Sequence, residues 1–105
     1  MATVTVMPGV CGMETTIKSS VDDMYNVQLE INSTCPHIQQ MAAAVPQVSA
    51  LAEIRKPMTE SAIYLAASAA KCHTACPVPS AIIKAVEVAA GLALPKDVQF
   101  TISKD

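Results

Sequence analysis

The first third of the chain alternates apolar and polar side chains, the pattern of strands that are covered on one face. The alternation is clearest where Val27, Leu29 and Ile31 are interleaved with polar residues. Proline and glycine interrupt the pattern after the first segment, and two aspartates interrupt it after the second, as hairpin connections do. The pattern predicts strands in residues 3–7, 13–21 and 25–32.

From Pro36 onward the apolar positions recur with the period of a helix. Pro46 ends the first helical segment, and Gly91 follows the last one at a position where helices commonly terminate. Apolar residues alternate again in residues 98–102, which predicts a closing strand. The predicted helices are residues 36–45, 47–54, 60–71 and 79–90, the second having the weakest pattern.

This order of elements predicts an α+β fold, a two-layer sandwich with helices on one face of a sheet. The sheet is expected to be mostly antiparallel and four-stranded, with three N-terminal strands and one C-terminal strand, and three to four helices cover it. A chain of 105 residues has the length of one domain, so residues 1–105 are expected to form a single domain.

Composition excludes several classes of partner. Hydrophobic residues make up 51% of the chain, yet no apolar run approaches the roughly 20 residues that span a membrane. The first ten residues lack the pattern of a signal peptide, so we expect a cytoplasmic protein with reduced thiols. The net charge of −2, the dispersed basic residues and the lack of tryptophan argue against binding to nucleic acid.

Four cysteines lie at the ends of the predicted elements. The first and third strands of a meander run in the same direction, so Cys11 and Cys35 leave the sheet at the same edge. Cys76 joins them if the last helix begins at that edge. The closing strand would then run parallel to the first and third strands.

Two of these cysteines directly precede a proline that opens a predicted helix: Cys35 and Cys76. Helix starts present free N–H groups and a positive dipole end, so we expect both sulfurs to have thiolate character. Cys72 lies four residues before Cys76, with His73 between them. This C-x3-C spacing is less diagnostic of a metal site than C-x2-C.

Three short sequences, CG at Cys11, STC ending at Cys35 and CPVPSAIIKAVEVAAGLALP from Cys76, resemble a family of small uncharacterised proteins from anaerobic prokaryotes. The resemblance extends over the whole chain. It implies that these three residues are the signature cysteines of a domain of unknown function, and it implies no activity.

The CPVP segment that begins at Cys76, with the helix and strand that follow it, is similar to the CPxP segment of TusA/SirA-like sulfur carriers. In that family the cysteine carries a persulfide at a helix start, so the resemblance implies this role for Cys76 alone. Those carriers have the motif near the N-terminus, whereas here it lies near the C-terminus and three further cysteines are present.

Three functions remain open. In the first, Cys11, Cys35 and Cys76, with Cys72 or His73 as the fourth ligand, bind an iron–sulfur cluster or zinc. The dispersed ligands and the anaerobic family favour the cluster. Such a protein would transfer electrons or sulfur to a protein partner.

The second function is a persulfide carrier or redox thiol at Cys76 or Cys35, with His73 or His37 as proton acceptor. The third is a partner-binding module in which the cysteines only pack as small apolar side chains. No nucleophile elbow, phosphate-binding loop or zinc-protease motif is present, so catalysis by this chain alone is not expected. The oligomeric state stays undetermined.

Overall fold

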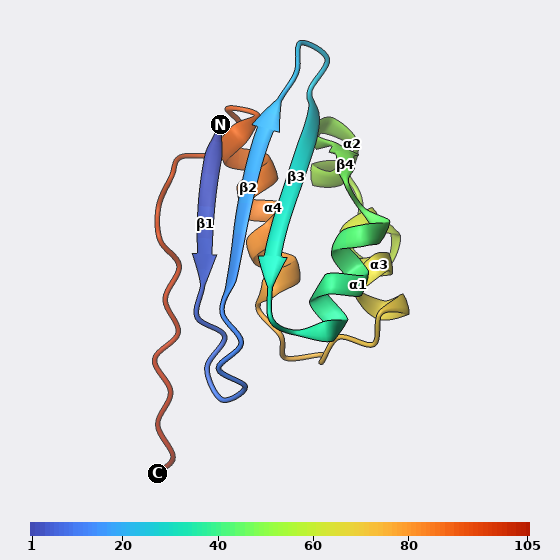
Figure 1. Ribbon diagram of the computed structural model, residues 1–105. Coiled ribbons are helices and arrows are strands. Elements are labelled where there is room, and N and C mark those ends of the chain that lie inside the picture. The colour runs from blue at the N-terminus through green and yellow to red at the C-terminus, as the bar shows by residue number, and fades with distance from the viewer.

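The N-terminal third forms the predicted meander of strands. The computed structural model describes residues 1–105, and its first strands are β1 (Ala2–Val6), β2 (Thr15–Val21) and β3 (Asn26–Ser33). β2 pairs antiparallel with both neighbours, with Ile17 opposite Val4 on one side and Ile31 on the other (Figure 1). Side chains on the helix-facing side are buried or half-buried except for Val21 at the end of β2, and those between them are mostly exposed, as the alternation predicts.

The fourth strand lies elsewhere than predicted. β4 (Gln47–Ser49) pairs antiparallel with β3, which places Val48 opposite Val27 in a sheet of order β1-β2-β3-β4. Three residues with one buried side chain cannot display alternation, so the sequence pattern assigned them to a helix. Residues 95–105, where the closing strand was expected, have no regular secondary structure. The α+β class with a four-stranded antiparallel sheet is confirmed.

Four helices follow the meander and a short 3-10 turn separates two of them. They are α1 (Pro36–Ala44), α2 (Ala50–Arg55), the 3-10 turn η1 (Met58–Glu60), α3 (Ala62–Ala69) and α4 (Val78–Ala89). α4 lies behind β1 and β2, whereas α1, α2 and α3 gather near β3 and β4 (Figure 1). The largest fully buried side chains are Ile17, Ile38, Met41, Ile63 and Ile82, so aliphatic side chains and one methionine fill the core.

Small residues let α4 lie close to the sheet. Its buried face includes Ile82, Val86 and two alanines, Ala85 and Ala89. The buried Ser19 hydroxyl of β2 donates a hydrogen bond of 2.9 Å to the Ala85 carbonyl oxygen, which ties the helix to the strand. A serine on the apolar face of β2 therefore has a packing role.

The end of α4 has the predicted glycine. Gly91 has a φ of +75°, a conformation that glycine adopts without strain. The Gly91 N–H donates to the Val88 carbonyl and the Leu92 N–H to the Glu87 carbonyl, which is a Schellman motif. α4 runs back along β1, so it begins at the edge where β1 and β3 end (Figure 1).

Replacing Ser19 with alanine should lower the free energy of unfolding by about 1 kcal/mol, because the buried hydrogen bond to α4 is lost. Urea denaturation measures the difference. Ser20→Ala is the matched control, because Ser20 is the next residue and its side chain is exposed on the opposite face. An equal loss in both variants would contradict the role given to the Ser19 hydroxyl.

Candidate functional site

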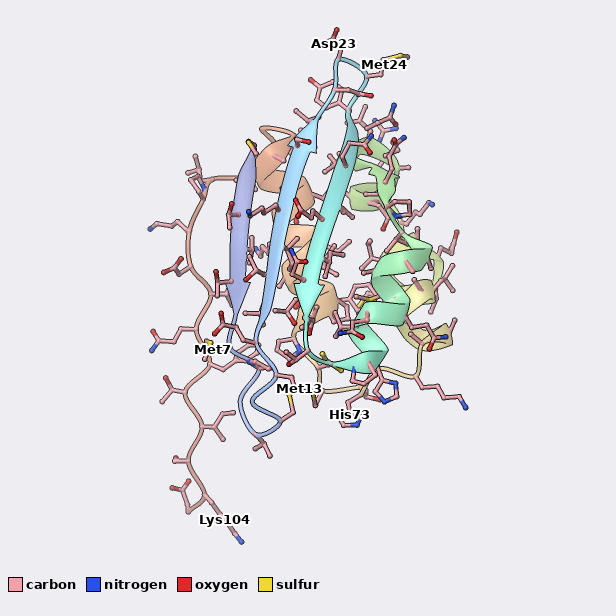
Figure 2. The ribbon with its side chains drawn as sticks, viewed as in Figure 1. Met7, Met13, Asp23, Met24, His73 and Lys104 are labelled. Carbon is pink, nitrogen blue, oxygen red and sulfur yellow. The ribbon has the colours of Figure 1, made fainter.

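All four cysteines occupy loops or caps at one end of the molecule, where β1 and β3 end and α1 and α4 begin. Figure 2 shows Met7, Met13 and His73 together at this end, and they belong to the β1–β2 loop and to the segment before α4. Cys35, Cys72 and Cys76 are half-buried against the core, and Cys11 is exposed. All four cysteines therefore lie at the end of the molecule that strand direction and helix start predict.

Cys35 is held at the start of α1 by its backbone. It is the N-cap residue in an extended conformation, and its carbonyl accepts the Gln39 N–H at 3.0 Å. Its own N–H donates to the Ser33 hydroxyl at 3.1 Å, and Ser33 accepts a further hydrogen bond of 2.8 Å from the Thr15 hydroxyl. A chain of hydrogen bonds from β2 through β3 therefore positions Cys35.

Cys72 follows the end of α3 and does not continue the helix. Lys71 has a φ of +59°, the left-handed conformation that terminates helices. The Cys72 N–H donates to the Ala67 carbonyl and the Lys71 N–H to the Ser68 carbonyl, a second Schellman motif. The C-x3-C spacing therefore spans a loop, and the two sulfurs do not share a helical face.

A tight turn then brings the chain to Cys76. The Cys76 N–H donates to the His73 carbonyl at 3.0 Å, and α4 begins two residues later, with Pro77 as its N-cap residue. The Cys76 sulfur accepts a hydrogen bond from the Val78 N–H. This is the contact that a sulfur before a helix start is expected to make.

Cys11 lies in the β1–β2 loop between two glycines. Gly9 and Gly12 have φ values of +92° and +67°, and the Gly12 N–H donates to the Gly9 carbonyl across a turn. No hydrogen bond from another element fixes this turn, so Cys11 is the least constrained of the four cysteines.

His37 contributes to the site in a way that the sequence did not reveal. Its Nδ1 lies 2.8 Å from the Ala70 carbonyl oxygen, so Nδ1 carries the proton and donates it. This bond joins the start of α1 to the end of α3. The ring lies 6.4 Å from that of His73 between centroids.

Burial and neighbouring thiols both raise the pKa values of Cys72 and Cys76. Burial raises the pKa of Cys72, and the negative charges of Cys76 and Cys35 raise it further. Burial also raises the pKa of Cys76, the Val78 N–H opposes this, and the charges of Cys35 and Cys11 add to the rise.

The expected thiolate character of Cys76 is wrong for the metal-free protein. The helix start does lower the pKa through the Val78 N–H, as predicted, but burial has the larger effect and the pKa of Cys76 rises. A sequence places a sulfur at a helix start without showing how much water it loses there.

The side chains do not form a metal-binding arrangement as they stand. The structure has no group of three or more histidine, cysteine, aspartate or glutamate side chains that could hold a metal ion. The four cysteines come from three segments that meet at one end of the molecule.

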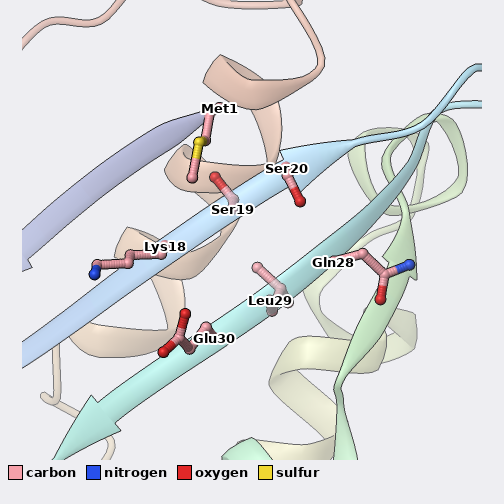
Figure 3. Close-up of a pocket in the computed structure, with 7 residues that line it drawn as sticks. All are labelled: Met1, Lys18, Ser19, Ser20, Gln28, Leu29 and Glu30. Carbon is pink, nitrogen blue, oxygen red and sulfur yellow. The ribbon is translucent and has the colours of Figure 1, made fainter.

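A separate hollow of about 170 Å³ opens over β2 and β3 (Figure 3). Lys18 and Glu30 line it and lie opposite each other in the register of the two strands. None of the four cysteines lines this hollow. Polar residues of this kind are typical of the solvent face of an antiparallel sheet, so the hollow adds nothing to the cysteine site.

Comparison with known proteins identifies the family. Residues 2–102 match the model of a family of unknown function, DUF6951. The chain belongs to this family. No curated protein and no solved structure matches it. No helix is long and apolar enough to cross a membrane.

Replacing Cys35 with serine should make Cys72 and Cys76 react faster with iodoacetamide at alkaline pH, where thiols ionise and carry the charge that acts on their neighbours. A neighbouring negative charge raises both pKa values, so removing it lowers them and increases the thiolate fraction, which is the reactive form. Mass spectrometry of the separate peptides measures each rate across a range of pH.

Cys11→Ser is the matched control, because the charge of Cys11 affects the pKa of Cys76 and not that of Cys72. It should speed alkylation of Cys76 alone. Equal rates for both residues in wild type and in the two variants would show that the sulfurs are not near neighbours.

Proposed function

We propose that this protein binds a thiophilic metal centre, an iron–sulfur cluster or a zinc ion. Cys11, Cys35 and Cys76 are the proposed core ligands, and Cys72 or His73 completes the set. The observation that supports this most strongly is the position of Cys76, which directly precedes α4 at the end of the molecule where Cys11 follows β1 and Cys35 follows β3 (Figure 1). Soft thiolates from separate segments suit both kinds of centre.

The electrostatics of the site favour a cation. Burial and neighbouring thiols both raise the pKa of Cys72 and Cys76, and no lysine or arginine charge opposes the rise. Thiolates gathered here would repel one another without compensation. A bound metal supplies the missing positive charge and deprotonates the thiols that coordinate it.

The scaffold supplies two kinds of ligand position. Backbone hydrogen bonds hold Cys35, Cys72 and Cys76, whereas Cys11 lies on an exposed glycine turn that can close over a metal. Metal–sulfur bonds of about 2.3 Å require this closure together with rotation of the cysteine side chains.

The two histidines add a nitrogen donor to the sulfur set. The Nδ1 of His37 donates to the Ala70 carbonyl at the end of α3, and the ring of His73 lies 6.4 Å from that of His37 between centroids. His73 is the proposed ligand of the pair, and His37 fixes the loop that carries His73 and Cys72.

The alternative function is a persulfide carrier or redox thiol at Cys76. The hydrogen bond from the Val78 N–H to the sulfur favours it, because this contact stabilises a thiolate or a terminal sulfur. The raised pKa of Cys76 opposes it, since a nucleophile should be ionised near neutral pH. In either function, the protein would pass electrons or sulfur to a protein partner.

Protein purified without exposure to oxygen or chelator should contain iron with inorganic sulfide, or about one zinc per chain. Elemental analysis and the absorption spectrum measure this directly. Cys76→Ser should weaken cobalt or zinc binding more than about 100-fold, because changes to outer-shell groups alone cost 10- to 100-fold.

Thr74→Ala is the matched control, because Thr74 is exposed in the same loop and offers no soft ligand. It should bind metal as the wild type does. Anaerobic protein that lacks iron and zinc and also fails to bind added cobalt would contradict the metal proposal. Mass spectrometry that finds one added sulfur atom on Cys76 in such a sample would support the carrier instead.

Metal binding should release protons and become tighter as the pH rises. Burial and thiolate repulsion keep Cys72 and Cys76 protonated near neutral pH, so coordination must displace these protons. Titration calorimetry in buffers of different ionisation enthalpy counts the protons. Zinc binding with no proton release and no pH dependence would mean that the thiols are not the ligands.

A further inference from the structure

The C-terminal segment (residues 95–105) lies outside the packed body of the protein. Its apolar side chains are largely exposed, with Val98 at 63%, Phe100 at 72% and Ile102 at 89%. The only phenylalanine of the chain is among them. The DUF6951 match runs through residue 102, so this apolar alternation is part of the family domain. An exposed β pattern of this kind indicates a strand without a partner.

The sheet has an open edge at β1. β1 pairs with β2 on one side and has no strand on the other, so alternate N–H and C=O groups along it are unpaired. Ala2 and Val4 are only half-buried on the helix-facing side. The edge therefore offers both backbone groups and apolar surface to an added strand.

The C-terminal segment does not fill this edge in its own chain. It runs beside β1 in the same direction (Figure 1). Among the backbone hydrogen bonds of loops and turns, the segment makes one, from the Lys96 N–H to the Leu94 carbonyl, and none of them joins it to β1. Lys104 lies far beyond Met7, the residue that follows β1 (Figure 2). The C-terminal segment therefore extends past the end of β1 (Figure 1).

We propose that residues 98–102 of one copy add as a strand to the β1 edge of a second copy, and that reciprocal exchange forms a dimer. The added segment and β1 have the same length of five residues. Val98, Phe100 and Ile102 then extend the apolar layer beside Val4, and the intervening polar residues face solvent. This dimer is independent of the proposed metal centre.

The full chain, with its thiols reduced and a chelator present, should sediment as a dimer in analytical ultracentrifugation. Phe100→Asp should halve the mass to that of a monomer, because the charge falls on the apolar face of the added strand. Thr101→Asp is the matched control, because its side chain falls on the solvent face. Phe100 is exposed within the single chain, so its replacement removes no core contact. Circular dichroism should therefore show an unchanged fold in both variants.

Hydrogen exchange distinguishes pairing of residues 98–102 with β1 of a second copy from pairing with β1 of the same chain. Amides of residues 98–102 and of β1 should be protected at high concentration, and dilution to the monomer should abolish this protection. A monomer with these amides protected would show docking within one chain and overturn the proposal. A monomer with exposed amides, or a dimer that Phe100→Asp leaves intact, would overturn it as well.

Discussion

The packing of α4 against the inner face of β1 and β2 is the contact on which the rest of the structure depends. Ile82, Ala85 and Val86 are fully buried in this contact. The hydrogen bond from the Ser19 hydroxyl to the Ala85 carbonyl fixes the position of α4 along β2. Because α4 runs back along β1, its first turn lies where β1 and β3 end. Cys76 therefore reaches the same edge as Cys11 and Cys35 by the direction of one helix.

Local backbone geometry then decides how firmly each sulfur is held. A left-handed residue, Lys71, ends α3 and turns the chain so that Cys72 faces the core. Ser33 anchors Cys35, and the bond from His37 to the Ala70 carbonyl joins the two neighbouring helices. Cys11 alone lies on a turn that no other element supports, so the site combines a fixed part with an adaptable one.

Two physical effects compete at Cys76, and their balance shapes the chemistry. The start of α4 offers an N–H that stabilises the thiolate, whereas burial and neighbouring thiols destabilise it. Burial has the largest effect, so the pKa of Cys76 is raised in spite of its position before a helix start.

Most of the fold was predictable because hydrophobic periodicity is a local property. The three N-terminal strands, the four helical regions and the glycine that ends α4 all follow from it. The fourth strand was not predictable, because β4 exists through its pairing with β3 and has only Val48 buried. Residues 98–102 have the stronger alternation of apolar and polar side chains, yet they form no strand within one chain. A strand also needs a neighbouring strand whose backbone N–H and C=O groups lie opposite its own.

The sequence by itself determined that the cysteines lie at element ends and that Cys11 and Cys35 share an edge, because antiparallel strands reverse direction at each turn. Only the tertiary structure decided that Cys76 lies at this same end of the molecule and that His37 bonds to the end of α3. It also decided that the thiols resist ionisation, since burial depends on which residues pack around each sulfur. Spacing along a chain carries no information about that packing.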